Sequence, residues 1–179
     1  MYKIKIIAFL LLASALAANA QITKGNWMVG GDGNYTNSKI INTKNEIISS
    51  GNSIRLFPNI GYFIVDKLVL GVNVNFNYGK NVGIPSNTAF GAGPFIRYYF
   101  LKPEKKINLF TDANIIFYTS KTQGSDSENT NSYRFKAGSV IYLNSSVGLE
   151  ITLNYKSQKL FYTSKYFTIG IGFQIHLEK

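Results

Sequence analysis

The feature that most constrains this chain is an alternation of large apolar residues with small or amide-bearing residues, repeated along most of its length. In residues 68–79, Leu, Val, Phe and Tyr occupy every second position, and Gly and Asn occupy most positions between them. Successive side chains of a strand point to opposite sides, so a period of two predicts a strand with one apolar face. The same pattern predicts seven further strands, over residues 26–35, 53–64, 89–101, 107–118, 133–143, 147–156 and 167–177. Pro58 and Pro94 each remove a hydrogen-bond donor, and we expect a local bulge at each.

The polar segments between these strands alternate in length. The long ones span residues 37–51, 80–87, 119–132 and 157–165, and the short ones span 65–67, 102–106 and 144–146. Outer-membrane barrels have long loops outside the cell and short turns in the periplasm. An even number of strands then leaves both chain ends on the periplasmic side.

The apolar faces of these strands indicate contact with lipid. No charged residue after position 20 falls on the apolar face of a predicted strand, and a charge at the bilayer midplane costs about 2–4 kcal/mol. Aromatic residues near strand ends suit interfacial girdles: Tyr62, Tyr98, Phe100, Phe117, Tyr155 and Phe167. Unpaired strand edges are costly in hydrocarbon, so the first and last strands must pair. The sequence therefore predicts an all-β fold, a closed antiparallel up-and-down transmembrane β-barrel of about eight strands, with a soluble barrel as the alternative.

The first twenty residues have the pattern of an export signal. Lys3 and Lys5 precede an apolar run, and Ala18-Asn19-Ala20 supplies the small-x-small cleavage pattern. We expect a cleaved signal peptide over residues 1–20 and one outer-membrane barrel domain over residues 21–179, with a retained anchor helix as the alternative. The chain has no cysteine, which argues against a lipoprotein, a disulfide-stapled domain and thiolate catalysis.

The formal net charge of +10 does not indicate nucleic-acid binding. The basic residues form no stripe or helix face, and Lys105-Lys106 is the densest pair outside the signal. A cationic exterior among anionic lipid head groups is the simpler interpretation. We expect contact with outer-membrane lipids, lipopolysaccharide and the barrel-assembly machinery, and possible extracellular partners through the loops over residues 37–51, 80–87, 119–132 and 157–165.

Two stretches resemble a known family. Residues 58–71, PNIGYFIVDKLVLG, resemble the strand-turn-strand signature of the outer-membrane β-barrel domain family, and residues 93–100, GPFIRYYF, resemble its next marker. The resemblance implies a small OmpA/OmpX-like, porin-like barrel of the cell envelope. Many such barrels end in an aromatic residue that is read during insertion. This chain ends Leu177-Glu178-Lys179, so we expect Phe173, Ile175 and Leu177 to take that role.

Eight strands enclose a space just wide enough for side chains to fill. The charged residues expected to face this lumen are Asp32, Arg55, Arg97, Asp112, Arg134, Lys136, Glu150 and Lys156. We expect opposite charges among them to pair and plug the barrel, which predicts a structural or surface-interaction protein. The alternative is a narrow channel for small solutes that favours anions, because five positive charges face three negative ones.

An enzyme is the weakest interpretation. His176 is the only histidine, and a Ser-His-acid site needs a nucleophile beside its histidine. No helix follows Gly30-Gly31-Asp32-Gly33, so a phosphate-binding loop is not expected there. The sequence therefore predicts no catalytic residue, no metal site and no cofactor, and leaves a lipid-modifying barrel enzyme as the least favoured alternative.

Overall fold

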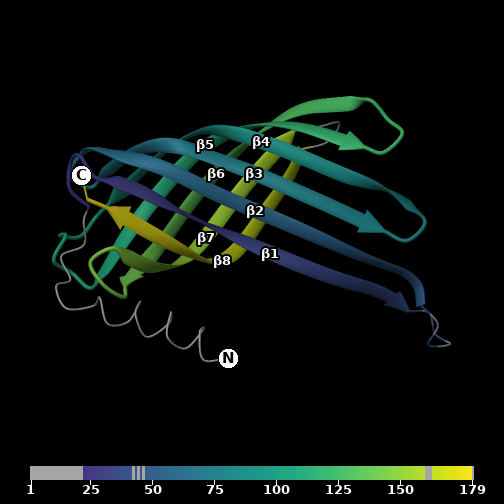
Figure 1. Ribbon diagram of the computed structural model, residues 1–179, viewed down its shortest axis with the longest axis horizontal. Coiled ribbons are helices and arrows are strands. Elements are labelled where there is room, and N and C mark those ends of the chain that lie inside the picture. The colour runs from purple at the N-terminus through teal and green to yellow at the C-terminus, as the bar shows by residue number, and fades with distance from the viewer. Residues whose placement is uncertain (1–21, 42, 44, 46, 160–162, 179) are drawn as a thin grey trace.

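The computed structural model describes residues 22–41, 43, 45, 47–159 and 163–178, and its strands form a closed barrel (Figure 1). The strands are β1 (Trp27–Ile41), β2 (Ile47–Val65), β3 (Leu68–Asn81), β4 (Ile84–Tyr99), β5 (Ile107–Thr122), β6 (Ser127–Tyr142), β7 (Val147–Lys159) and β8 (Thr163–Leu177). Each pairs antiparallel with the next, and β1 pairs with β8. The predicted all-β, eight-stranded closed barrel is confirmed. The predicted signal peptide lies outside the described residues.

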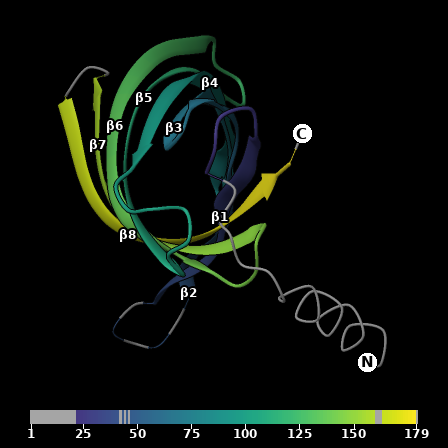
Figure 2. The same ribbon diagram turned by 90° about the vertical axis from the view of Figure 1, so that its left-hand side faces the viewer.

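The barrel has two distinct ends. At one end, here called the turn end, residues 66–67, 100–106 and 143–146 connect the strands, and the described chain begins and finishes there (Figure 1). At the other, here called the hairpin end, the chain turns between β1 and β2, β3 and β4, β5 and β6, and β7 and β8. Figure 2 looks into the barrel from the turn end. In the part of the chain that the structure describes, no helix is long and apolar enough to cross a membrane.

The two faces of the strands reverse the polarity of a soluble protein. On the outer face, Ile96 is 45% exposed and Leu109 is 48% exposed, whereas the inward-facing Arg97 and Asp112 are 1% and 2% exposed. The alternation of exposed and buried positions continues along the middle of most strands. The exterior is therefore apolar and the interior holds the charges, as a bilayer requires.

The strands are longer than the sequence pattern predicted, so the expectation of long irregular loops at the hairpin end was wrong. Only Val82 and Gly83 separate β3 from β4, and residues 123–126 separate β5 from β6. Toward the hairpin end, polar side chains continue the antiparallel pairing. For example, the Tyr35 hydroxyl and the Asn37 amide both donate to Asn52 Oδ1 at 2.7 Å. These segments are polar strands, which a search for apolar alternation does not detect.

The two strand prolines do not produce the expected bulges. The register between β2 and β3 is the same on both sides of Pro58, and the register between β4 and β5 is the same on both sides of Pro94. Instead, pairing lapses for two residues on one side of the strand, at residues 57–58 and 93–94. A proline removes one ladder donor without inserting a residue, so the register has no reason to shift.

Closure between β1 and β8 is short. Pairing runs only from Trp27 opposite Leu177 to Gly31 opposite Phe173. Beyond that point residues 32–41 of β1 and 163–172 of β8 are not paired with each other, and the two strands diverge toward the hairpin end (Figure 1). We call these two unpaired stretches the seam. The expectation that the first and last strands pair is confirmed, and the pairing occupies the turn end of the two strands.

Gly31 lies where the seam begins, and its backbone requires glycine. Its φ is +143°, and a Cβ atom there would lie 2.5 Å from the Phe57 carbonyl oxygen and 2.8 Å from the Pro58 Cα. Residues with a side chain rarely adopt such a φ. The glycine therefore allows β1 to stay against β2 while it leaves β8.

Candidate functional site

The lumen of the barrel is organised around Arg97 on β4. Its Nε donates to Asp112 Oδ2 on β5 at 3.2 Å, and its Nη1 donates to Glu150 Oε1 on β7 at 2.5 Å. The same Nη1 lies 3.3 Å from Gln174 Oε1 on β8 and 3.3 Å from the Tyr99 hydroxyl oxygen. One guanidinium therefore links three other strands of the wall, and it satisfies two buried carboxylates at once.

A second contact between opposite charges lies beside this hub. Lys136 Nζ on β6 is 4.0 Å from Asp32 Oδ2 on β1, with the lysine side chain 5% and the aspartate side chain 31% exposed. The three carboxylates expected in the lumen are thus all engaged, Asp112 and Glu150 by Arg97 and Asp32 by Lys136.

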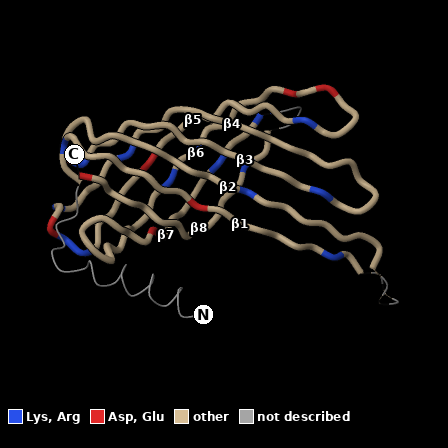
Figure 3. The backbone as a smooth tube through the Cα atoms, viewed as in Figure 1, with Lys and Arg blue, Asp and Glu red and all other residues tan. Residues whose placement is uncertain are grey.

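The remaining three lumen cations form no ion pair with a carboxylate of the described residues. Among the described residues, Arg55, Arg134 and Lys156 have no Asp or Glu oxygen within 4.0 Å. Arg134 Nη2 donates to Asn75 Oδ1 at 3.0 Å, and its guanidinium carbon lies 5.3 Å from the centre of the Phe57 ring. Among the described residues, the network expected from sequence therefore divides into five charges in ion pairs and three cations that contact no carboxylate. Figure 3 shows charged residues both along the middle of the strands and at the two ends of the barrel.

Below the charged layer, the turn end of the lumen is filled by apolar side chains. The buried cluster consists of Ile22, Met28, Phe63, Val69, Phe95, Tyr99, Phe110, Val140 and Tyr142. Ile22 lies before β1, is fully buried, and accepts a hydrogen bond from the Lys67 amide at 2.9 Å. Its side chain therefore adds to the packing that closes the turn end of the lumen.

This apolar layer is the part of the site that sequence reasoning missed. A usable signal exists, because Phe63, Val69, Phe95 and Phe110 all occupy inward positions within a few residues of the turn end. The position of Ile22 has no such signal, since it depends on how the segment before β1 folds back over the barrel mouth.

His176 lies inside the same layer and is fully buried. The rings of Phe63, Tyr99 and Tyr142 surround it at centroid distances of 5.5, 6.0 and 5.6 Å. Neither ring nitrogen has a hydrogen-bond partner in the described part of the chain. This environment is aromatic packing. Among the described residues, no group of three or more His, Asp or Glu side chains is placed to hold a metal ion.

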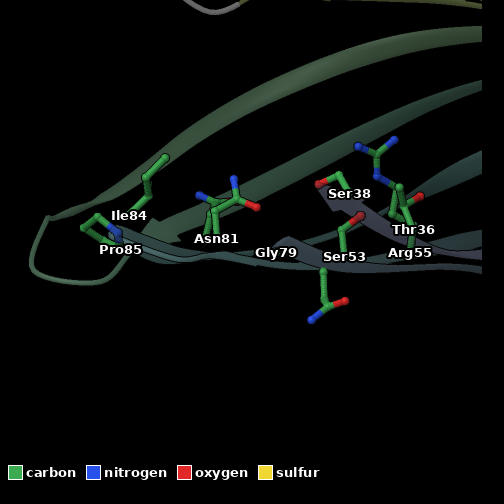
Figure 4. Close-up of a pocket in the computed structure, with 10 residues that line it drawn as sticks. Thr36, Ser38, Ser53, Arg55, Gly79, Asn81, Ile84 and Pro85 are labelled. Atoms are coloured by element: carbon green, nitrogen blue, oxygen red, sulfur yellow. The ribbon is translucent and has the colours of Figure 1, made fainter. Parts of the chain in front are cut away.

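The hairpin end of the lumen is open and polar. A cavity of about 320 Å³ lies there between β1, β2, β3 and β4 (Figure 4). Its wall includes Thr36, Ser38, Ser53 and Asn87, and among the described residues that line it Arg55 alone is charged. The lumen is thus filled at the turn end, crossed by ion pairs above that, and open to the outside at the hairpin end.

A closed barrel with an apolar exterior and a charged, filled interior defines the small transmembrane β-barrel class. Three solved structures share this fold. They are Neisserial surface protein A (TM-score 0.60, 11% identity, 85% of this chain and 97% of that chain covered), the N-terminal β-barrel domain of Pseudomonas aeruginosa OprF (0.53, 12%, 86% and 98%) and the outer membrane protein OprG of Pseudomonas aeruginosa (0.55, 10%, 91% and 100%).

These neighbours are small barrels of the kind that the sequence resemblance indicated. At identities of 10–12% the likeness concerns the fold. The sequence matches no protein-family model and no curated protein.

Proposed function

We propose that this protein is an integral barrel of a bacterial outer membrane, with a structural or surface-interaction role and a lumen that side chains keep shut. The apolar exterior and the fold shared with outer-membrane barrels support the location. The export signal over residues 1–20 supplies the route.

The observation that carries the proposal is the double closure of the lumen. A solute entering from the hairpin end meets first the Arg97 ion pairs with Asp112 and Glu150, and then the apolar cluster around Tyr99 and Ile22. To pass, it must separate buried, paired charges, which costs several kcal/mol. A lumen closed in two layers favours a structural or surface-interaction role over that of a pore.

A narrow channel for small anions is the alternative, and the three unpaired cations near the hairpin end favour it. Planar-bilayer recording separates the two roles. We expect no conductance steps from the purified barrel, beside a sixteen-stranded porin as a positive control. Reproducible anion-selective steps from the unmodified protein would overturn the closed-lumen proposal.

Cysteine labelling tests the orientation of the barrel. The chain has no native cysteine, so each introduced cysteine is labelled without background. Val82 lies in a hairpin-end connection and Lys105 in a turn-end connection. We expect Val82→Cys to react with a membrane-impermeant maleimide on intact cells, and Lys105→Cys to react only after the outer membrane is permeabilised. N-terminal sequencing of the purified protein should begin at Gln21. The reverse labelling pattern would contradict the proposed orientation.

The role also includes proposed contacts at the surface. Lipopolysaccharide and an extracellular partner would meet the hairpins over residues 37–51, 80–87, 119–132 and 157–165, while the barrel-assembly machinery inserts the strands. No catalysis and no nucleic-acid binding form part of the proposal. The aromatic surroundings of His176 support the first exclusion, because a general base needs a hydrogen-bonding partner to act on.

A further inference from the structure

Three cations in the upper lumen lack a counter-ion and lie near one another. Arg134 and Lys156 are cross-strand partners on β6 and β7, and the Arg134 guanidinium carbon lies 5.3 Å from the ring of Phe57, two residues from Arg55 on β2. We call Arg55, Arg134 and Lys156 the cationic cluster. Charges held together in this way repel one another unless an anion joins them.

Two members of the cluster, Arg134 and Lys156, contact neighbouring lumen side chains. Arg134 is 8% exposed, and it donates to Asn75 Oδ1 at 3.0 Å. The Tyr118 hydroxyl donates to the same oxygen at 3.1 Å, and the Lys156 ammonium lies 4.8 Å from the centre of the Tyr118 ring. The amide nitrogen of Asn75 is buried without a hydrogen-bond partner in the described part of the chain. Arg134, Lys156 and an unused N–H donor therefore lie around the Asn75 and Tyr118 side chains, and all three are groups that can bind an anion.

The cluster flanks the seam on both sides. Arg55 on β2 is paired with Asn34 of β1, three residues beyond the point where β1 leaves β8. Lys156 on β7 is paired with Tyr166 of β8, within the part of β8 that β1 does not cover. A molecule entering between β1 and β8 therefore reaches the cluster from the side of the barrel.

The outer rim of the seam is apolar. Phe167, Ile169 and Ile171 of β8 point outward and are 70%, 74% and 66% exposed. These residues place the seam against hydrocarbon, where unpaired backbone N–H and C=O groups cost several kcal/mol each. A molecule with a polar group can hydrogen-bond to the unpaired strand edges, and its acyl chain can cover the apolar outer residues of β8. A lipid has both parts.

From these observations we propose that the cationic cluster binds the phosphate group of an anionic lipid, which enters sideways through the seam. The phosphate contacts Arg134, Lys156 and Arg55, and the acyl chains lie outside along Ile169 and Ile171. The site takes the headgroup of a membrane lipid, and the lumen below it stays closed by the Arg97 ion pairs.

The test uses the purified mature barrel in a neutral detergent and native mass spectrometry to count bound lipid. Dilauroyl phosphatidylglycerol is titrated in one arm and zwitterionic dilauroyl phosphatidylcholine in the other. We expect one tightly bound phosphatidylglycerol and no comparable phosphatidylcholine. Glycerol phosphate and inorganic phosphate, which lack acyl chains, should not displace the lipid at equal concentration.

The double variant Arg134→Gln/Lys156→Gln should weaken phosphatidylglycerol binding by about tenfold or more, because charge-assisted hydrogen bonds to phosphate are lost. The matched control Lys102→Gln/Lys105→Gln removes the same charge from an exposed connection at the turn end and should bind as the parent does. If the double variant fails to fold, Lys156→Gln alone, whose side chain is less buried, should still weaken binding by about threefold.

Three results would overturn the proposal. Unchanged phosphatidylglycerol binding in the folded cluster variants would place the lipid elsewhere. Equal binding of phosphatidylcholine would show that the headgroup charge is not read. Displacement by inorganic phosphate at equal concentration would assign the cluster to a soluble anion. The closed-lumen proposal is tested separately, because it depends on the absence of conductance in planar bilayers and not on lipid binding.

Discussion

Arg97 and Glu150 lie on β4 and β7, three strands apart in the barrel wall, and Arg97 Nη1 is 2.5 Å from Glu150 Oε1. Both side chains are almost completely buried, at 1% and 6% exposure. A charge pair that crosses the lumen holds distant parts of the wall at a fixed separation. The contact therefore serves the shape of the barrel as well as its closure.

The first prediction concerns the removal of this cation. Arg97→Met leaves Asp112 and Glu150 buried without a counter-charge, and we expect it to lower the free energy of unfolding by about 3–5 kcal/mol. Urea unfolding in phosphatidylcholine vesicles measures the change. The triple variant Arg97→Met/Asp112→Asn/Glu150→Gln should recover part of the loss, because no charge is then left alone. A loss no larger than that of the exposed Lys121→Met would contradict the role of Arg97 as the hub.

The sequence predicts those features of the fold that depend on residues close together in the chain. The period of two is local, and it located all eight strands and the inward position of Arg97 and Asp112. Which lumen charges meet depends on the stagger of the strands around the barrel. Arg97 and Asp112 are direct cross-strand partners, whereas the contact of Arg97 with Glu150 spans the lumen and has no counterpart in the sequence pattern.

The extent of pairing between β1 and β8 is another feature that the sequence pattern does not predict. Trp27 and Leu177, at opposite ends of the sequence, face each other in the first of five consecutive residue pairs between β1 and β8. Closure in hydrocarbon was predicted from the cost of unpaired edges, but how many residues pair depends on the course of β1 after Gly31. Gly31 belongs to the segment Gly30-Gly31-Asp32-Gly33, for which the sequence argued only against a phosphate-binding loop. Its role in letting β1 diverge from β8 depends on contacts with β2 that only the fold supplies.

The second prediction separates the two faces of one strand. Leu153 is 48% exposed on the outer face of β7, and the adjacent Asn154 faces inward with Lys136 as its cross-strand partner. Leu153→Asp places a carboxylate in hydrocarbon and should cost about 2 kcal/mol or more. Asn154→Asp gains the attraction of Lys136 and should cost under about 1 kcal/mol. Unfolding free energies in vesicles provide the comparison, and equal costs would count against the assignment of faces.

The third prediction tests the backbone of Gly31. Gly31→Ala introduces a Cβ only 2.5 Å from the Phe57 carbonyl oxygen, at a φ of +143°, and should destabilise the barrel by about 1–3 kcal/mol. Gly79→Ala is the matched control, since its Cβ would lie 3.9 Å from the nearest atom, Ser53 Cβ. We expect that control to fold with unchanged stability. If both alanine variants unfold at the same urea concentration, Gly31 is not needed for the divergence of β1.

The last prediction concerns backbone protection along β8. Amides in residues 173–177 face β1 or β7 within paired ladders, whereas those in residues 163–172 that point away from β7 are not paired with another described strand. Because an amide exchanges with solvent deuterium once its hydrogen bond opens, these unpaired amides should exchange faster than their neighbours that point toward β7. Hydrogen exchange followed by NMR in detergent micelles resolves the alternation within one strand, and the β7-facing amides serve as the internal control. A closed seam would protect both sets equally, and it would also remove the lateral entrance on which the lipid site depends.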